Sequence, residues 1–124
     1  MNVLIIEDEV IIGLHIETIL ERMGHKVLMI ATNSQEALKC ADEEKVDLVI
    51  SDIRLMGEML DGIDICEEIQ TEHGCAIILI TAFKDQDTLK KALGIEVEGY
   101  LVKPFSEEEL ESLVNSVSSR YCDA

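Results

Sequence analysis

Reactive polar side chains follow short, mainly apolar segments at four places in the chain. The segments span residues 3–6, 47–51, 76–80 and 99–102, and the polar residues that follow them are Glu7 and Asp8, Asp52, Thr81 and Lys103. An acidic side chain that ends a buried strand is costly to desolvate unless it takes part in a site. Because ligands of an open parallel sheet bind at the carboxyl ends of its strands, we expect these side chains to meet there.

Three of these residues, Glu7, Asp8 and Asp52, are carboxylates and would together carry three negative charges. Two unit charges 4 Å apart repel by about 4 kcal/mol at an effective dielectric constant of 20. Such a cluster therefore needs a cation. Carboxylates completed by water and phosphate oxygens suit Mg²⁺, whereas Zn²⁺ would favour cysteine or histidine ligands.

The same residues could carry out phosphoryl chemistry with Asp52 as the nucleophile. Phosphoryl transfer to an aspartate gives an aspartyl phosphate, and its transition state needs in-line positioning and neutralised equatorial oxygens. Mg²⁺ would supply part of that neutralisation and the Lys103 ammonium another part, while the Thr81 hydroxyl could donate a hydrogen bond to a further oxygen. We therefore predict a phosphoryl-transfer site.

The elements that must position these residues alternate along the chain. Strand-like segments recur roughly every 20 to 30 residues with helical periodicity between them, which predicts an α/β domain with a parallel sheet. Residues 26–31 are the second of five predicted strands. A first helix is indicated by apolar residues at helical spacing, and Gly24 would end it. These apolar residues are Ile12, Ile16, Ile19, Leu20 and Met23.

Four further helices are predicted from capping residues and apolar stripes. Ser34 can cap the second helix, and the third is expected to start near residues 61–62. The fourth is expected around residues 85–93, and Ser106 with Glu109 fits a capping box for the fifth. These elements predict one domain over residues 1–120 and a short C-terminal tail over residues 121–124.

Composition limits the classes of function. The chain has 124 residues, 48% of them hydrophobic, which is enough for one domain with a real core. Its apolar runs are too short to cross a bilayer and no signal peptide precedes the first strand, so we expect a cytoplasmic protein without membrane contact. A net charge of −16 argues against direct nucleic acid binding. The four cysteines lack zinc-binding spacing, and we expect the three histidines to be structural or exposed.

Together these residues resemble the receiver domains of the bacterial two-component response-regulator family. The matching motifs are Glu7-Asp8, Asp52 at the end of the third strand, Thr81-Ala82 after the fourth, and Lys103-Pro104-Phe105 after the fifth. The resemblance covers essentially the whole chain. It implies a flavodoxin-like (βα)5 domain whose five-stranded parallel sheet has the order 2-1-3-4-5, with a cis bond before Pro104.

The resemblance also implies roles for the acidic residues. Asp52 would be the phosphoacceptor. Asp8 and Asp52 would be direct Mg²⁺ ligands, with the backbone carbonyl of Arg54 as a third. Glu7 would act mainly through bound water.

The switch and the partners follow from the same resemblance. Thr81 and Lys103 would hold the phosphoryl oxygens, and Tyr100 matches the aromatic residue that turns inward when the threonine closes on the phosphoryl group. The donor would be a sensor histidine kinase or a histidine phosphotransfer protein. The changed surface of the fourth helix, fifth strand and fifth helix would signal to a downstream effector protein or to a C-terminal output domain missing from this chain. Such a domain promotes only its own phosphorylation and dephosphorylation, so we do not expect an enzyme.

One segment departs from the family pattern. Receivers usually have a proline shortly after the phosphoacceptor, whereas residues 55–60 contain none and form a longer loop. Arg54 and Phe83 stand two residues beyond Asp52 and Thr81, and we expect these bulky side chains to limit the approach of water to the phosphoryl group. The Glu-Asp-Glu-Val opening is similar to that of some stand-alone receivers and general-stress-response regulators.

Two other classes of protein are alternatives to a phosphorylatable receiver. An aspartate-nucleophile phosphatase of the haloacid dehalogenase type needs a second aspartate two residues beyond the nucleophile as general acid. That position is Arg54 here, which cannot act as one. A receiver fold used only as a protein-binding module would have lost phosphorylation, and the complete acid, threonine and lysine set argues against it. Equilibrium Mg²⁺ binding distinguishes this binding module from a phosphorylatable receiver, because a degenerate site should have no appreciable affinity for Mg²⁺.

Overall fold

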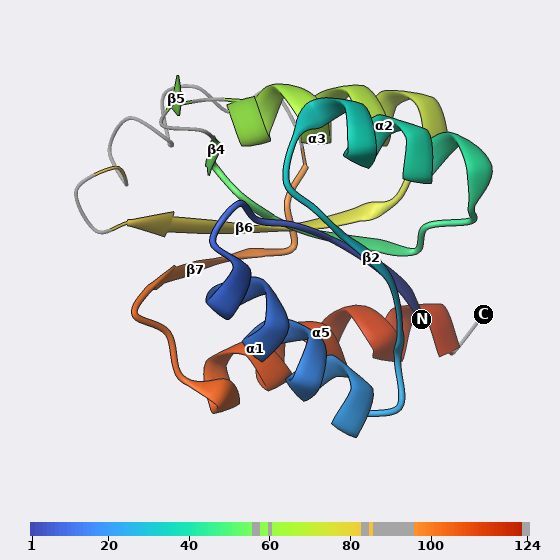
Figure 1. Cartoon of the computed structure of the whole chain (residues 1–124). Helices are drawn as coiled ribbons and strands as arrows, with labels where there is room; N and C mark the ends of the chain where they lie inside the picture. The colour runs from blue at the N-terminus through green and yellow to red at the C-terminus, as the bar shows by residue number, and fades with distance from the viewer. Residues whose placement is uncertain (56–57, 60, 83–84, 86–95, 123–124) are drawn as a thin grey trace.

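In the computed structural model, the described residues form three layers, with a parallel sheet between two pairs of helices (Figure 1). It describes residues 1–55, 58–59, 61–82, 85 and 96–122. Helices α2 (Ser34–Glu43) and α3 (Asp61–His73) cover one face of the sheet. Helices α1 (Val10–Arg22) and α5 (Glu107–Cys122) cover the other face.

The main sheet consists of five parallel strands. They are β1 (Asn2–Ile6), β2 (Lys26–Ala31), β3 (Leu48–Asp52), β6 (Ala76–Ala82) and β7 (Gly99–Lys103). Their order is β2-β1-β3-β6-β7, which confirms the order 2-1-3-4-5, with β6 and β7 as the fourth and fifth strands. Two short strands, β4 (Arg54–Leu55) and β5 (Glu58–Met59), form a separate antiparallel pair that the sequence did not predict.

The first, second, third and fifth predicted helices are present as α1, α2, α3 and α5. The residues predicted for the fourth helix, 85–93, lie outside the described residues except for Asp85. Within the described part of the chain, no helix combines the length and the hydropathy needed to span a membrane.

The helix caps confirm one prediction and correct another. The backbone N of Glu109 donates to Ser106 Oγ at 3.1 Å and the backbone N of Ser106 donates to Glu109 Oε1 at 3.3 Å, which is the predicted capping box. The prediction that Ser34 caps the second helix was wrong, because Asn33 Oδ1 accepts the hydrogen bond from the backbone N of Glu36 at 2.9 Å. Both residue types cap well, and the extended backbone of Asn33 (φ −152°, ψ 171°) places it just before the first turn.

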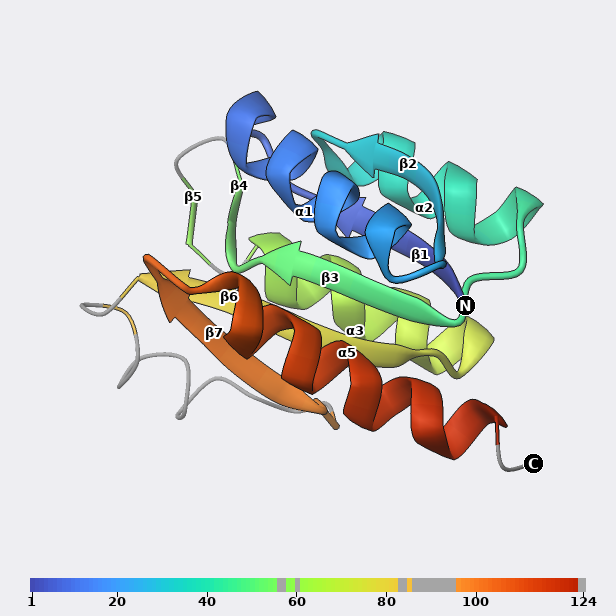
Figure 2. The same cartoon turned by 90° about the horizontal axis from the view of Figure 1, so that it is seen from below.

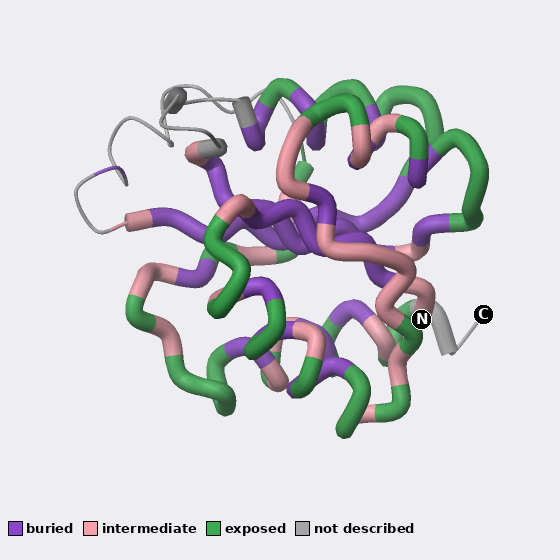
Figure 3. The backbone as a smooth tube through the Cα atoms, in the orientation of Figure 1, coloured by how far each residue is buried: buried purple, intermediate pink, exposed green. Residues whose placement is uncertain are grey.

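The sheet divides the core into two apolar clusters. Alternate residues of β1 point to opposite faces, so Val3 and Ile5 pack with α1 and α5, while Leu4 and Ile6 pack with α2 and α3. Every residue of β3 is buried, as expected for a central strand covered on both faces. The tube in Figure 3 accordingly shows a buried central sheet and exposed outer helix turns. The core therefore holds the strand ends in fixed positions.

Candidate functional site

The strand-end residues meet at one edge of the sheet. Figure 2 shows the arrowheads of the strands pointing to this edge. The register pairs Asp52 at the end of β3 with Ile80 of β6, and Ala82 of β6 with Lys103 of β7. Glu7 directly follows β1, the other neighbour of β3. Residues far apart in the sequence are therefore neighbours at this edge, as the sequence predicts.

Glu7, Asp8 and Asp52 form a carboxylate cluster whose oxygen atoms lie within 4.8 Å of one another. Glu7 and Asp52 are buried, and Asp8 is partly exposed. Glu7 Oε1 accepts a hydrogen bond from the backbone N of Glu9 at 3.1 Å, whereas its Oε2 is buried without a hydrogen-bond partner in the part of the chain that the structure describes. A buried carboxylate oxygen in this state fits a site for a hard cation and its bound water.

The acidic cluster perturbs the ionisation of Glu7. Burial, reinforced by the negative charge of Asp52, raises the pKa of Glu7 to about 7. The hydrogen bond from Glu9 and the positive charge of Lys103 oppose this shift without cancelling it. In the absence of a metal ion, Glu7 is therefore protonated in a large fraction of molecules near neutral pH, and a divalent cation would favour its ionised form.

Lys103 brings an ammonium group into the same cluster. Its Nζ lies 2.6 Å from Asp52 Oδ2 and 3.5 Å from both Glu7 Oε2 and Glu9 Oε1. Burial lowers the pKa of Lys103, but the hydrogen bond to Asp52 and the surrounding carboxylates outweigh burial and raise the pKa overall. The ammonium therefore stays charged beside the acceptor. The peptide bond to Pro104 is cis, as the resemblance implies.

The backbone around Asp52 is held by two close contacts. Asp52 Oδ1 accepts a hydrogen bond from the backbone N of Arg54 at 3.0 Å. Gly62, in the first turn of α3, lies so close that a Cβ atom there would be 1.8 Å from the carbonyl oxygen of Asp52. Because only glycine fits at this position, Gly62 sets how closely α3 approaches the acceptor, a role that no sequence motif indicates.

Thr81 lies on β6, which pairs with the strand that carries Asp52, and Tyr100 lies on β7, the next strand beyond β6. Thr81 is buried one residue beyond the register partner of Asp52, and its hydroxyl donates to the carbonyl oxygen of Ala82 at 3.1 Å. Tyr100 is 41% exposed on β7. The structure thus brings Thr81 to the site edge with its hydroxyl bonded to the backbone, and it leaves Tyr100 at the surface.

An ion pair beside the acceptor was not predicted. Arg54 Nε lies 2.8 Å from Asp85 Oδ2 and Arg54 Nη2 lies 3.0 Å from Asp85 Oδ1, which is a bidentate pairing. Asp85 is only 4% exposed. A pair this far apart in the sequence leaves no local pattern that could reveal it. Phe83, predicted to flank the site together with Arg54, lies outside the described residues.

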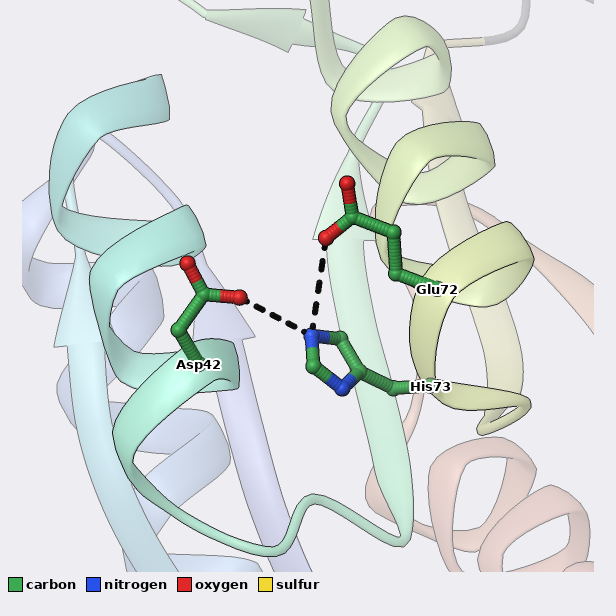
Figure 4. Close-up of side chains that lie close together, drawn as sticks. All are labelled: Asp42, Glu72 and His73. Atoms are coloured by element: carbon green, nitrogen blue, oxygen red, sulfur yellow. Dashed lines mark hydrogen bonds and ion pairs between the residues drawn. The ribbon is translucent and has the colours of Figure 1, made fainter.

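A second group of potential metal ligands lies on the helical surface (Figure 4). His73 Nε2 is 3.0 Å from Asp42 Oδ1 and 3.7 Å from Glu72 Oε2, and the three side chains join the last turns of α2 and α3. All three residues are exposed. This cluster cross-links two neighbouring helices at the surface, which agrees with the prediction that His73 is structural or exposed.

The sequence pattern matches the response regulator receiver domain over residues 3–115. The chain belongs to this family. Receiver domains are signalling domains rather than conventional enzymes, and the resemblance seen in the four motifs is confirmed. This receiver is 35% identical over 120 residues to the transcriptional regulatory protein PdtaR of Mycobacterium tuberculosis, a match that covers 97% of this chain and 58% of PdtaR. The chain spans about half the length of the curated relatives it matches.

Solved structures share the same fold. A two-component response regulator from Clostridium difficile superimposes with a TM-score of 0.86 at 26% identity, covering 98% of each chain. The anti-anti-sigma factor PhyR from Bartonella quintana superimposes with a TM-score of 0.85 at 31% identity, covering 99% of this receiver and 50% of PhyR. The predicted flavodoxin-like fold is therefore confirmed for nearly the whole chain.

Proposed function

We propose that this receiver accepts a phosphoryl group on Asp52 from a phosphohistidine of a sensor histidine kinase or of a histidine phosphotransfer protein. The observation that carries the proposal is the setting of the Asp52 carboxylate. It is buried at the carboxyl edge of the sheet, with one oxygen on the Lys103 ammonium, the other on the Arg54 backbone N–H, and two more carboxylates beside it.

Mg²⁺ fits this site, because the donors are carboxylate oxygens and one of them is buried without a hydrogen-bond partner among the described residues. Asp8 and Asp52, with the backbone carbonyl of Arg54, would hold the ion, and Glu7 would act through bound water. When bound, the ion supplies charge neutralisation for the transferring phosphoryl oxygens.

The residues of the chain position the two reacting groups. An Asp52 carboxylate oxygen attacks phosphorus, the N–P bond of the phosphohistidine breaks, and the leaving imidazole nitrogen takes up a proton. Lys103 is already in contact with the acceptor and neutralises developing charge. Later, water attacks phosphorus, the bond from phosphorus to Asp52 breaks, and inorganic phosphate leaves.

The signal arises when the Thr81 hydroxyl exchanges its bond to the Ala82 carbonyl for one to a phosphoryl oxygen. Tyr100 then turns inward from its exposed position, which changes the surface formed by β7 and α5. The phosphoryl group needs to bias two pre-existing states by only a few kcal/mol. The changed surface is read by a downstream effector protein or by an output domain of a longer protein.

The donor docks on the first turns of α1. Val10, Ile11 and Leu14 are 61%, 83% and 48% exposed, an unusual set of apolar side chains for a helix that begins beside the site. A phosphohistidine must approach Asp52 closely, so its carrier has to cover the surface next to that edge. We do not assign nucleic acid or membrane binding to this domain, and its cytoplasmic location and the domain boundary at residue 120 stay predictions from the sequence.

Intact mass after incubation with a small-molecule phosphodonor and Mg²⁺ tests the proposal. Wild type should gain one phosphoryl group, and Asp52→Ala should gain none. Asp42→Asn, which removes an acid from the second cluster, serves as the matched control and should be modified like wild type. No gain in wild type, under conditions that modify an established receiver, would favour the binding-only alternative.

A further inference from the structure

Arg54 contacts the acceptor through its backbone and Asp85 through its side chain. Its backbone N donates to Asp52 Oδ1, and its guanidinium makes two hydrogen bonds to the Asp85 carboxylate. The hydrogen bond to Asp85 is the main reason that the pKa of Arg54 is raised, and the charge of Asp52 contributes as well. Arg54 therefore contacts the carboxylate that would carry the phosphoryl group through its backbone and contacts Asp85 through its guanidinium.

Phosphorylation would change the competition for this guanidinium. Arginine binds carboxylates and phosphates with the same two-pronged geometry, and the more highly charged phosphoryl group offers three strong acceptor oxygens. The Arg54 side chain is 37% exposed, so it has room to change partner. Before phosphorylation, Asp85 occupies the two donors that a phosphoryl group would use.

We propose that the side chain of Arg54 binds the phosphoryl group and that Asp85 competes with this group for the guanidinium. Asp85 therefore limits how tightly the site retains its phosphoryl group. This inference rests on the proposed function and adds a residue pair to it. It gives Arg54 an electrostatic role in place of a purely steric one. The two roles predict different affinities in the single and double variants of Arg54 and Asp85.

The test measures the binding of fluoroberyllate, a phosphoryl mimic, by calorimetry at saturating Mg²⁺ in the full chain. Arg54→Gln should weaken binding about threefold, and Asp85→Asn should tighten it about threefold, the size expected for a partly exposed charged pair. The double variant should bind like Arg54→Gln alone, because the inference requires Asp85 to act through Arg54. The lifetime of the acyl phosphate, followed by intact mass, should change in the same order.

Two control variants make the same charge changes as Asp85→Asn and Arg54→Gln, but at the edge of the sheet where the strands begin. Asp42→Asn removes an acid paired with His73, and Arg120→Gln removes a guanidinium paired with Glu98, so neither should alter fluoroberyllate affinity. If Asp85→Asn tightens binding equally with and without Arg54, Asp85 acts by its own charge and the inference fails.

If Arg54→Gln binds fluoroberyllate as tightly as wild type, the inference also fails. This comparison is sufficient by itself if the buried Asp85→Asn variant does not fold. A wild-type chain that neither binds fluoroberyllate nor becomes phosphorylated would instead refute the proposed function, and the inference would fall with it. The two failures are therefore distinguishable.

Discussion

Both edges of the sheet carry charged side chains, but the two edges use them differently. At the edge where the strands begin, Asp47 Oδ2 accepts a hydrogen bond from the backbone at the start of β1 at 2.8 Å, and His73 lies against the exposed Asp42. At the edge where the strands end, Glu7 and Asp52 are buried around the ammonium group of Lys103.

The difference separates polar groups that serve the fold from those that serve chemistry. At the first edge, side chains satisfy backbone groups: Gln70 donates to the carbonyl oxygen of Glu96 at 2.8 Å and accepts from its backbone N at 3.2 Å. In such contacts each polar group has a hydrogen-bond partner within the protein, so no ligand is needed. At the second edge, Glu7 Oε2 has no hydrogen-bond partner within the described ranges, and like charges are held together. Burial of that kind is unfavourable until a ligand arrives.

Removing the ammonium group should have the largest effect. Lys103→Met leaves Asp52 and Glu7 without the side chain that contacts both, so we expect phosphorylation by a small-molecule donor to slow about 100-fold. Arg120→Gln, which removes a guanidinium from Glu98 at the other edge, should leave the rate unchanged. Intact mass against time gives both rates. Equal slowing in both variants would mean that overall charge, rather than contact with the acceptor, sets the rate.

The two ends of α3 should respond differently to an added methyl group. Gly62→Ala would drive a Cβ atom into the carbonyl oxygen of Asp52, and we expect a loss of about 3 kcal/mol in the free energy of unfolding. Gly74, which follows the helix at the opposite edge, has a φ of +71° but open space around it, so Gly74→Ala should lose about 1 kcal/mol. Urea denaturation measures both values, and a larger loss at Gly74 would contradict the close-approach argument.

Glu7 should make the metal-free receiver less stable as the pH rises. Its pKa of about 7 in the folded state exceeds the ordinary value of 4.5, so the folded chain binds this proton more tightly than the unfolded chain. The resulting stability is fully present below pH 4.5 and should fall by about 2 kcal/mol between pH 5 and pH 7. Denaturation of wild type and Glu7→Gln at several pH values, with chelator present, isolates this contribution. A Glu7→Gln profile parallel to that of wild type would show that Glu7 does not cause the change.

The exposed cluster at the other edge should matter least. His73→Ala removes the contact to Asp42, and we expect a loss of about 0.5 kcal/mol in stability, as for other exposed ion pairs. Phosphorylation of Asp52 should proceed at the wild-type rate. Urea denaturation and intact mass measure the two effects, and a slower phosphorylation would mean that this cluster communicates with the site.

The sequence predicted the strands and the acidic cluster for one physical reason. A parallel sheet converts the order of strand ends along the chain into neighbours in space, so Asp52 and Lys103 could be placed together without knowing any contact between them. The rule works because each of these residues directly follows a strongly apolar segment. Tyr100 was predicted by resemblance, and its inward turn stays a prediction.

Features that depend on loop geometry could not be predicted from the sequence. The pairing of Arg54 with Asp85 and the short β4–β5 strands depend on how two loops approach each other, which no periodicity encodes. The cap of α2 depended on the backbone angles of one residue, since Asn33 and its neighbour Ser34 are both good capping residues. The close contact at Gly62 likewise appears only when α3 is seen beside Asp52.

The site takes its carboxylates and its ammonium group from segments that lie far apart in the sequence. Glu7 follows the first strand of the sheet and Lys103 ends the last one, and both contact the central acceptor region. A chain emerging from the ribosome therefore carries Asp52 well before the lysine that completes its surroundings has been synthesised. Under the proposed function, a molecule in which Lys103 is not yet in place should be phosphorylated more slowly by its donor. Phosphorylation then favours molecules whose last strand has joined the sheet.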